Sequence, residues 1–243
     1  MEPQTWSIVV LCYNEAANIA RVIQGVTATL SVISPRAHEI VVVDDGSSDD
    51  SVRIVRELAA GRDDLRLVEH GVNKGVGEAL QSGYAAVRME NVCAVPGDGQ
   101  FDFDELLPFA RLPPDTFVSF TRRNNTEYSA YRRALTRTNR QVNRWFLGAV
   151  LEDANWVKAY KVEALRKIPL EMRSSLIQSE IPAKLILLGY KMVEPDSKYL
   201  PRAGGKALGA SPKMVLRAAR ETWKLMRVVR RFAHARARGR EHP

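Results

Sequence analysis

Short runs of apolar, mostly β-branched residues alternate along the chain with segments in which apolar residues recur every three or four positions. The first pattern is typical of buried strands and the second of amphipathic helices. Their alternation predicts an α/β fold with a mainly parallel central sheet flanked by helices. The expected strands are residues 7–12, 39–43, 65–68, 92–95, 117–120, 156–160 and 191–193. The first expected helix begins near residue 19. The other expected helices span about 50–60, 75–87, 129–147, 175–188 and 212–236.

Polar residues follow three of these strands, at the point where each strand ends. The three segments are residues 13–15, 44–47 and 96–100, and they carry carboxylates and amides. In open α/β sheets, ligands bind in the crevice outside the carboxyl ends of the strands. The sequence therefore predicts one ligand-binding crevice built from these three segments.

Charge is divided unevenly along the 243 residues, of which 45% are hydrophobic and 26% are charged. The formal net charge of +8 is composed of −9 over residues 1–120, +7 over 121–199 and +10 over 200–243. A uniformly basic nucleic-acid-binding protein is therefore disfavoured, and because no recognition motif is present we expect no nucleic-acid partner. The apolar runs are far shorter than the ~20 residues of a membrane-spanning helix.

Cysteine and histidine are rare in this chain, and their positions disfavour disulfide and zinc sites. The two cysteines, Cys12 and Cys93, lie in expected strands, which suits reduced thiols in the cytosol. The four histidines are scattered and no C-x-x-C is present, so we expect no zinc site. No basic segment precedes the apolar run of residues 8–11, so we expect no signal peptide.

Asp44 and Asp45 lie at the end of the second expected strand, upstream of the residues that would cap the next helix. A carboxylate at this place accepts a hydrogen bond from the ring N–H of uracil or guanine, or from a ribose hydroxyl. For the following residues, 47–50, the alternative is a role limited to helix capping. Residues 71–77 form neither a P-loop nor a complete dinucleotide fingerprint, but Lys74 and the N–H groups that begin the next helix are placed to line a phosphate.

Asp98 and Gln100 offer two oxygen ligands with one residue between them. Ligands of this type suit Mg²⁺ or Mn²⁺ bridging a diphosphate. The alternative is that Asp98 lies in a glycine turn that precedes a helix starting at Asp102.

Arginine is concentrated between residues 121 and 144, where seven arginines accompany a single acid. Spacing alone fits a solvated helix face for part of this set, which is the alternative. Arg122, however, directly follows the fifth expected strand and so reaches the edge of the crevice. Because arginine binds phosphate in a bidentate manner, we expect an anionic co-substrate there.

Several of these motifs together resemble the family 2 glycosyltransferases of the GT-A fold, and among them the dolichol- and polyprenyl-phosphate sugar synthases. The resemblance covers roughly residues 6–210, with the motifs at 9–15, 43–47, 73–79, 98–100 and 202–206. It implies transfer of a sugar from a nucleotide diphosphate sugar, with Mg²⁺ or Mn²⁺ as cofactor.

The resemblance also assigns roles to individual residues. The expected nucleotide-sugar site consists of Tyr13, Asn14, Glu15, Asp44, Asp45, Lys74 and Gly75. The expected metal ligands are Asp98 and Gln100. The expected catalytic residues from the resemblance are Asp98, Arg122, Arg132 and Arg202, of which the arginines match those that such synthases direct at donor and acceptor phosphates. Asp153 is added to them from its place just before the expected strand 156–160.

Two positions depart from the family pattern. The metal motif is usually Asp-x-Asp, and Pro96 stands where the first Asp is expected. The motif Arg-x-x-Gly-x-Ser-Lys is incomplete, because Ala207 replaces the Ser and Leu208 the Lys. These departures concern metal binding and acceptor identity more than the fold.

The acceptor determines what the enzyme must supply. A phosphate monoester is already anionic near neutral pH and attacks the anomeric carbon without a general base, so position and charge stabilisation suffice. A sugar hydroxyl requires a base, for which Asp153, next to Glu152, is the candidate. The alternative for Asp153 is a structural contact to nearby backbone or to an arginine.

The last expected helix carries an apolar stripe and a basic face. The stripe consists of Val215, Ala218, Ala219, Thr222, Leu225, Met226, Val229, Phe232 and Ala233. A basic amphipathic helix is typical of proteins that lie on an anionic bilayer surface. The alternative is a helix that packs on the domain and leaves its basic face in solvent.

The sequence thus predicts a GT-A domain over residues 1–210, with a nucleotide-sugar half (1–120) and an acceptor half (121–210), and a basic C-terminal helix and tail (211–243). The expected activity is inverting transfer of a sugar from a UDP- or GDP-sugar to polyprenyl phosphate, or to another lipid acceptor, at the cytoplasmic face of a membrane. Two alternatives remain: transfer to a hydroxyl of a glycan or lipid-linked glycan, and an inactive GT-A domain that acts as a scaffold. The sugar, the base and the oligomeric state are left open.

Overall fold

The central feature of the molecule is a seven-stranded sheet with strand order β3-β2-β1-β4-β7-β5-β8. The computed structural model of the chain describes residues 3–122, 153–201 and 212–239. Within these ranges the strands of the sheet are β1 (Trp6–Cys12), β2 (His38–Asp44), β3 (Leu65–Glu69), β4 (Asn91–Pro96), β5 (Thr116–Ser119), β7 (Lys158–Lys161) and β8 (Lys191–Val193). Two short strands, β6 (Thr121–Arg122) and β9 (Asp196–Ser197), pair with each other beside it.

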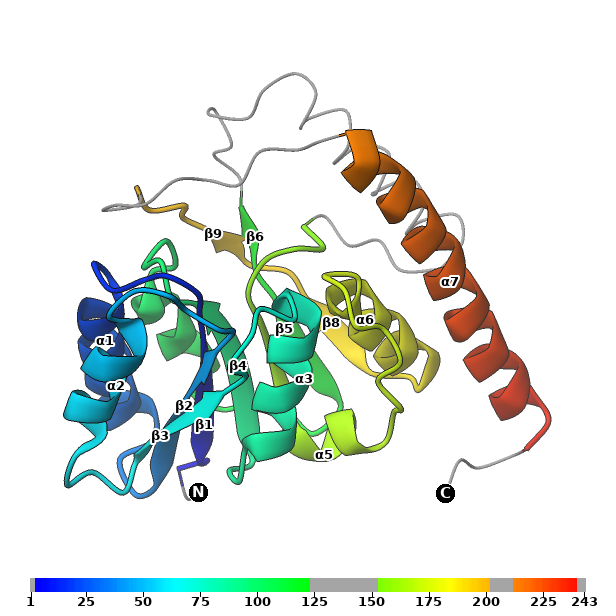
Figure 1. Ribbon diagram of the computed structural model, residues 1–243. Helices are drawn as coiled ribbons and strands as arrows, with labels where there is room; N and C mark the ends of the chain where they lie inside the picture. Colours follow the sequence, from blue (N-terminus) through cyan, green and yellow to red (C-terminus); the bar gives the residue numbers. More distant parts are fainter. Residues whose placement is uncertain (1–2, 123–152, 202–211, 240–243) are drawn as a thin grey trace.

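The predicted mainly parallel sheet is confirmed. β1 pairs in parallel with β2 and with β4, β2 pairs in parallel with β3, and β5 with β8. Only β7 runs antiparallel to both of its neighbours in this sheet, β4 and β5. The carboxyl ends of the parallel strands therefore lie at one edge, at the top of Figure 1.

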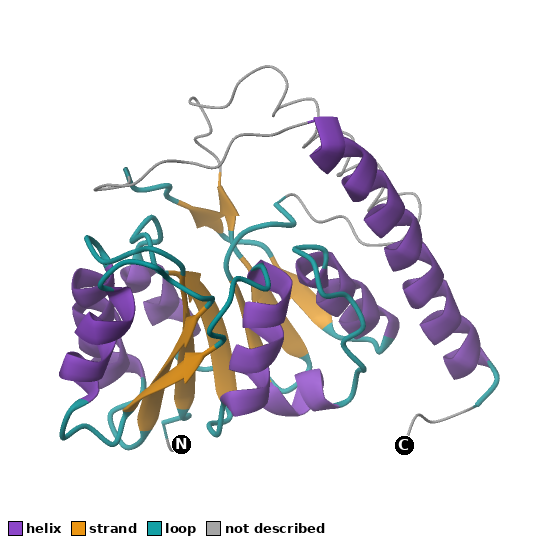
Figure 2. Ribbon diagram, in the orientation of Figure 1, coloured by secondary structure: helices purple, strands orange, loops and turns teal. Residues whose placement is uncertain are grey.

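Helices cover both faces of the sheet (Figure 2). One face is covered by α1 (Ile19–Ile33), α2 (Ser51–Ala59) and the 3-10 helix η1 (Phe103–Phe109). The other is covered by α3 (Val76–Ala86), α5 (Val162–Arg166) and α6 (Ile177–Leu187), with α7 (Pro212–Ala237) packed on the outside of α6. Two apolar cores result, one between each helix layer and the sheet.

The sequence of β1 shows why the sheet is buried on both sides. Ile8 and Val10 enter the core beneath α1, whereas Val9 enters the core beneath α3. Such a strand reads as a continuous apolar run because neither face meets water. The α3 layer lies close to β1: a Cβ added to Gly83 would lie 2.4 Å from a methyl carbon of Val9.

Most predicted elements match the structure to within two residues at each end. The alternative of a helix starting at Asp102 is confirmed, because Asp102 caps η1. The short helix α5 and the two-residue strands β6 and β9 were not predicted, because they are too short to show a period. The expected helix 129–147 lies outside the described residues.

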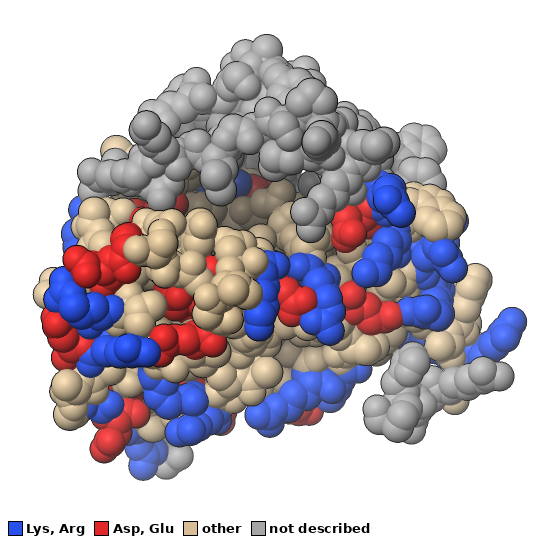
Figure 3. Space-filling view, in the orientation of Figure 1, with Lys and Arg blue, Asp and Glu red and all other residues tan. Residues whose placement is uncertain are grey.

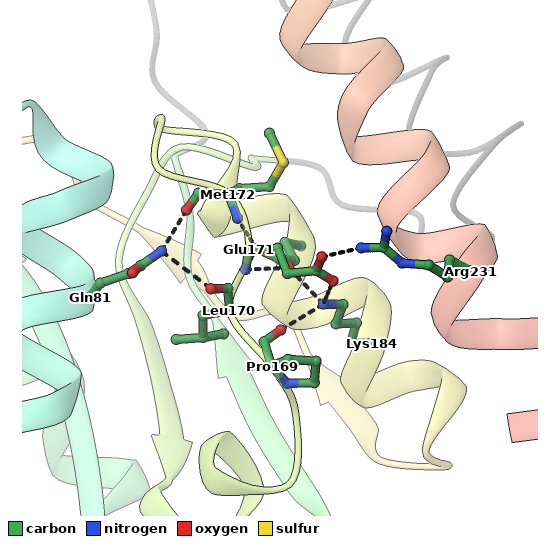
Figure 4. Close-up of polar contacts among 8 residues, drawn as sticks. Gln81, Pro169, Leu170, Glu171, Met172, Lys184 and Arg231 are labelled. Carbon is green, nitrogen blue, oxygen red and sulfur yellow. Dashed lines mark hydrogen bonds and ion pairs between the residues drawn. The ribbon is translucent and has the colours of Figure 1, made fainter. Parts of the chain in front are cut away.

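A buried ionic network holds the segment before α6 (Figure 4). The ammonium Nζ of Lys184 donates to Glu180 Oε1 at 2.7 Å and to the Pro169 carbonyl at 2.6 Å, and both charged side chains are fully buried. Glu180 also accepts hydrogen bonds from the N–H groups of Glu171 and Met172. The pair therefore organises an irregular segment, which Gln81 of α3 also holds by donating to the Met172 carbonyl at 2.9 Å.

Helix α7 packs against α6 through its apolar stripe. Leu225, Val228, Val229 and Phe232 are buried in the same core as α6, and Arg231 is paired with Glu171. The prediction that this stripe faces a bilayer is therefore wrong for residues 220–239, where the alternative of a helix packed on the domain is confirmed. The basic side chains of this region remain outside.

Among the helices in the described ranges, none combines the length and apolar character needed to cross a bilayer.

We expect Lys184→Met to lower the free energy of unfolding by about 3–5 kcal/mol, because it leaves the buried carboxylate of Glu180 without its counter-ion. Adding Glu180→Gln removes that charge and should recover more than half of the loss. Denaturant unfolding followed by circular dichroism measures both variants. The control is Lys191→Met, whose side chain is 76% exposed and whose effect should stay within about 0.5 kcal/mol. Equal losses for the single and double variants would contradict the role of the ion pair.

Candidate functional site

The three polar segments predicted to form a crevice come together at the carboxyl edge of the sheet. β1 is flanked by β2 and β4, with Cys12 opposite Asp44 and Leu11 opposite Pro96. The residues that follow these three strands are therefore neighbours, as expected. The backbone confirms the connection, since Asp45 N–H donates to the Cys12 carbonyl and Gly97 N–H to the Leu11 carbonyl.

The segment after β1 is held against the segment after β2. Asn14 has a left-handed backbone, with φ of 55°, and its Oδ1 accepts a hydrogen bond from Ser48 N–H at 2.8 Å. Glu15 is buried, and its Oε2 accepts from Asn18 Nδ2 at 2.7 Å. Tyr13 is 41% exposed at the same edge. Asn14 and Glu15 are thus bound to the protein at this edge, while Tyr13 is exposed to solvent.

Asp44 is buried but only half satisfied. Its Oδ2 accepts hydrogen bonds from Gly46 N–H and Ser47 N–H, each at 3.0 Å. Its Oδ1 is also buried, and no hydrogen-bond partner for it is found among the described residues. A buried polar oxygen without a partner costs free energy, of the order of 1–3 kcal/mol. Asp44 is therefore the acid at this edge that retains an acceptor for the N–H or O–H group of a ligand.

Asp45, in contrast, is committed to the protein. Its Oδ1 accepts from Lys74 N–H at 2.9 Å and its Oδ2 from Gly75 N–H at 2.8 Å. His70 Nδ1 lies 2.8 Å from the same Oδ1, and His70 Nε2 lies 2.8 Å from Ser82 Oγ. The two adjacent acids, which look alike in sequence, thus have different roles, because Asp45 anchors the start of α3.

His70 was not singled out from the sequence. It follows β3 directly, so its place at the carboxyl edge was the available signal. If the ring carries its proton on Nδ1 and donates it to Asp45, Nε2 accepts from the Ser82 hydroxyl. The chain Asp45–His70–Ser82 then links the end of β2 to the middle of α3.

The loop before α3 is pressed against the turn after β2. Gly46 has φ of +78°, and a Cβ there would lie 2.4 Å from the carbonyl carbon of Val72. Only glycine permits this approach. Gly75 has φ of +92° and precedes the first residue of α3. The side chain of Lys74 is exposed, so its proposed contact with a phosphate stays a prediction.

Asp98 and Gln100 both lie at the crevice, but their side chains have different partners. Asp98 Oδ1 accepts from Gln100 N–H at 3.1 Å, which closes a turn at Gly99. Gln100 Oε1 accepts from the Tyr199 hydroxyl at 2.9 Å, and its Nε2 donates to the Leu200 carbonyl. The Gln100 amide thus holds the segment after β9, and its role as a metal ligand stays a prediction.

The described residues contain no cluster of three or more His, Cys, Asp or Glu side chains that could hold a metal ion. With Pro96 at the end of β4, Asp98 is the carboxylate that the 96–100 turn contributes. Mg²⁺ is commonly held by one or two carboxylates together with substrate phosphates and water. The donor set therefore fits a cation that arrives with a diphosphate and does not fit a cage made of protein ligands alone.

Arg122 is clamped from two sides. Its Nε and Nη2 donate to Asp153 Oδ2 at 2.6 Å and Oδ1 at 2.9 Å, which is a bidentate ion pair. Its guanidinium carbon lies 4.4 Å from the centre of the Trp156 ring. The Trp156 ring is fixed in turn by a hydrogen bond from Nε1 to Ser197 Oγ at 2.8 Å. The alternative expected for Asp153, a contact with an arginine, is confirmed, and the pair would have to separate before Asp153 could act as a base.

Lys158 lies behind this clamp and was missed by sequence reasoning. Its Nζ donates to the carbonyls of Ala154 and Trp156 at 2.8 and 3.1 Å, with the Asp153 carbonyl at 3.4 Å. Burial lowers its pKa from the ordinary 10.5 to about 8. Burial has the opposite effect on the Cys12 thiol, whose pKa is raised to about 12, so Cys12 is not a nucleophile.

Two expected phosphate ligands, Arg132 and Arg202, lie outside the described residues. So do the arginine-rich segment that contains Arg132 and the incomplete motif that begins at Arg202. Their roles remain predictions.

The sequence profile described as Glycosyl transferase family 2 matches residues 7–168. Among similar proteins, the undecaprenyl-phosphate 4-deoxy-4-formamido-L-arabinose transferase of Pseudomonas fluorescens is 33% identical over 132 residues, which cover 52% of this chain and 38% of that protein. A dolichyl-phosphate beta-glucosyltransferase of Trichomonas vaginalis is 33% identical over 106 residues, which cover 41% of this chain and 31% of that protein. The chain therefore spans well under half the length of these curated relatives.

Solved structures share the fold at low identity. Glucosyl-3-phosphoglycerate synthase from Mycobacterium tuberculosis, solved with Mn²⁺, UDP and glucosyl-3-phosphoglycerate, has a TM-score of 0.59 at 22% identity, covering 95% of this chain and 80% of that chain. A mannosyltransferase from Pyrobaculum calidifontis, solved with GDP-mannose and Mn²⁺, has a TM-score of 0.58 at 19% identity, covering 98% and 76%. These likenesses confirm the GT-A fold.

We expect Asp45→Ala to lower the free energy of unfolding by about 1–3 kcal/mol, since it leaves the N–H groups of Lys74 and Gly75 without their acceptor. Denaturant unfolding measures the loss. The matched control is Asp63→Ala, because Asp63 is an exposed acid whose removal should change stability by less than about 0.5 kcal/mol. Indistinguishable stabilities of the two variants would show that Asp45 is not an anchor.

Proposed function

We propose that this chain, which belongs to glycosyl transferase family 2, transfers a hexose from a UDP- or GDP-sugar to a polyprenyl phosphate at a membrane surface. The observation that carries the proposal is the half-satisfied carboxylate of Asp44 at the junction of three parallel strand ends. An acceptor at that place suits the ring N–H that uracil and guanine share.

The donor half, residues 1–120, is proposed to bind the nucleotide through the loops at the carboxyl edge. Asp44 accepts the base N–H, and Asn14 and Glu15 line the same wall. Lys74, exposed just before α3, is positioned to meet a phosphate near the start of that helix. Asp45 contributes by fixing the loop rather than by touching the nucleotide.

A divalent cation, Mg²⁺ or Mn²⁺, is proposed to bind between Asp98 and the diphosphate. When bound, it supplies positive charge that stabilises the leaving diphosphate. Structures of the same fold were solved with Mn²⁺ together with UDP or GDP-mannose, which supports a divalent cation for this chain too.

The acceptor half, residues 121–210, is proposed to receive a phosphate monoester. Two similar proteins are named for undecaprenyl phosphate and dolichyl phosphate, and this supports a polyprenyl phosphate. The ion pair of Arg122 with Asp153 supports it independently, because a hydroxyl acceptor needs a base and both Asp153 oxygens are hydrogen-bonded to Arg122. An anionic phosphate needs only a positioned cation.

The proposed reaction is a single displacement. An oxygen of the acceptor phosphate attacks the anomeric carbon and forms a new C–O bond. The bond from that carbon to the diphosphate breaks on the opposite side, and its electron pair leaves with the nucleoside diphosphate, so the configuration inverts. The protein contributes orientation of the two substrates and positive charge beside both phosphates.

The exposed face of α7 is proposed to dock on an anionic lipid surface, with the protein on the cytoplasmic side. Residues 220–239 contain seven Lys and Arg against one acid, Glu221, and the basic side chains gather at the right of Figure 3. Trp223 is 58% exposed and lies under the Arg227 guanidinium, 4.8 Å from its ring centre. Because the apolar stripe is covered by the protein, contact is expected to come from charge with one interfacial aromatic ring.

The proposal predicts a sugar-linked polyprenyl phosphate when purified protein is incubated with polyprenyl phosphate and a panel of UDP- and GDP-sugars. Mass spectrometry identifies the product and so the base and the sugar. EDTA should abolish product formation. Consumption of nucleotide sugar with a glycan acceptor alone would favour the hydroxyl acceptor, and no consumption with any acceptor would favour an inactive scaffold.

A matched pair of variants tests the donor site in the same assay. Asp44→Asn should raise KM for the donor roughly 10- to 100-fold, because an amide N–H₂ replaces a charged acceptor. Asp63→Asn, an exposed acid elsewhere, should leave KM unchanged. A donor KM that Asp44→Asn leaves unaltered would argue against the base contact.

Vesicle binding tests the membrane surface. The double variant Lys224→Glu/Arg227→Glu should weaken co-sedimentation with vesicles of anionic phosphatidylglycerol roughly 30-fold, since each basic residue contributes about 1 kcal/mol near such a surface. The control is Arg53→Glu/Arg56→Glu on α2, which changes the net charge equally on the far side of the molecule. Equal binding of the wild type to neutral and anionic vesicles would overturn the proposal.

A further inference from the structure

A lysine is buried in the middle of the sheet, where a charge is costly. Lys158 is the first residue of β7, between β4 and β5, and it pairs with Ala94 on one side and Ser119 on the other. It is 3% exposed. Moving an ammonium from water into such a place is unfavourable unless its N–H groups find partners. A charged side chain at this position therefore calls for a physical explanation.

The explanation lies in the carbonyls that Lys158 contacts. The three N–H groups of its ammonium meet the carbonyls of Ala154 and Trp156, at 2.8 and 3.1 Å, and that of Asp153 at 3.4 Å. These carbonyls belong to one short stretch, residues 153–156, that precedes the strand. The chain before β7 thus bends around the Lys158 side chain, and the ammonium donates hydrogen bonds to the carbonyls of this bend.

The same stretch carries both sides of the Arg122 clamp. The Asp153 carboxylate forms the bidentate ion pair with Arg122, and the Trp156 ring lies 4.4 Å from the guanidinium carbon. Arg122 N–H also approaches Asp153 Oδ2 at 3.4 Å. The two side chains that hold the guanidinium therefore belong to residues whose own carbonyls Lys158 contacts.

Four influences decide the charge of Lys158. Burial is the largest and favours the neutral amine, and the positive Arg122 acts in the same direction. The carboxylates of Asp153 and Glu194 favour the ammonium. The strand neighbours Ala94 and Ser119 carry no charge. The result is a pKa of about 8, below the ordinary 10.5, so Lys158 loses its proton just above neutral pH.

Deprotonation has opposite local and global consequences. A neutral amine keeps two N–H groups and turns a lone pair toward the carbonyls, so the 153–156 stretch loses an attractive contact. The free energy of unfolding changes the other way. Between about pH 8 and 10.5 the unfolded chain binds a proton at Lys158 that the folded chain does not, so this residue's contribution to stability rises with pH.

We propose that Lys158 is a positioning residue: its ammonium holds residues 153–156 in the shape that presents Arg122 to the acceptor phosphate. The proposal rests on the proposed function in one respect, namely that Arg122 meets a phosphate. Lys158 itself contacts no substrate. Its loss is expected to act through Arg122 and through pH.

The first test is the pH dependence of transfer in the wild type and two variants. The wild-type kcat/KM should fall above about pH 8. Lys158→Arg keeps its charge, so its decrease should move to higher pH by more than about one unit. Lys158→Met has no charge to lose, so at pH 7 its kcat/KM should be at least roughly tenfold lower than in the wild type and nearly flat above it.

The second test needs no activity. Hydrogen exchange of the peptide covering residues 153–158 at pH 7 should show protection in the wild type, because the Lys158 ammonium binds the carbonyls of this stretch. Lys158→Met should lack that protection while the strands β1 and β2 keep theirs, which shows that the variant folds. Lys161→Met, on the same strand and half-buried, is the matched control and should behave as the wild type in both tests.

The outcomes separate the two proposals. Loss of protection in Lys158→Met, but no transfer with any acceptor, would overturn the proposed function and leave the positioning role of Lys158 in place. Normal protection in Lys158→Met, or an alkaline decrease in activity that all three proteins share, would overturn the role of Lys158 whether or not transfer occurs.

Discussion

The parallel alignment of β1 between β2 and β4 is the constraint on which the rest of the site depends. It brings the ends of three strands, distant in sequence, to one edge of the sheet with Cys12 beside Asp44 and Leu11 beside Pro96. The loops that leave this edge are then close enough to bind one another. Asp45 ties the end of β2 to the start of α3, and the glycine turn at Gly46 allows the two backbones to touch. The proposed donor site is thus built largely from backbone groups held by buried acids.

The described part of the proposed acceptor half, residues 121–210, contains two buried lysines instead. Lys158 and Lys184 each gather carbonyl or carboxylate oxygens from a stretch of irregular chain, residues 153–156 and 169–171 respectively. Irregular backbone that is buried must find hydrogen-bond partners outside the sheet and helix ladders. A lysine ammonium supplies three donors from one side chain, which offsets the cost of removing the charge from water. Irregular backbone therefore finds hydrogen-bond partners in buried carboxylates in the first half of the domain and in buried ammonium groups in the second.

The sequence predicted the parts of the molecule that depend on local periodicity and not those that depend on long-range partners. Strands and helices followed from apolar spacing, and the crevice followed from polar residues at strand ends. The difference between Asp44 and Asp45 could not be predicted, because it depends on backbone N–H groups about thirty residues away. Gln100 was expected to bind metal, but its partner Tyr199 lies 99 residues further along the chain. Lys158 and Lys184 resemble surface lysines until the fold buries them.

The C-terminal helix shows why an amphipathic pattern alone does not identify what covers its apolar stripe. The stripe of α7 was consistent with a bilayer or with the domain, and the structure places Leu225, Val229 and Phe232 against the core shared with α6. That packing turns the basic face outward and fixes it relative to the crevice through the pair of Arg231 with Glu171, whose carboxylate also meets Lys184. The proposed docking by such a face depends on charge, so it is expected to weaken as salt rises. In the proposed function, the distance between the crevice and a lipid phosphate is then set by the rigid packing of α7 on α6 rather than by the depth to which a helix enters the membrane.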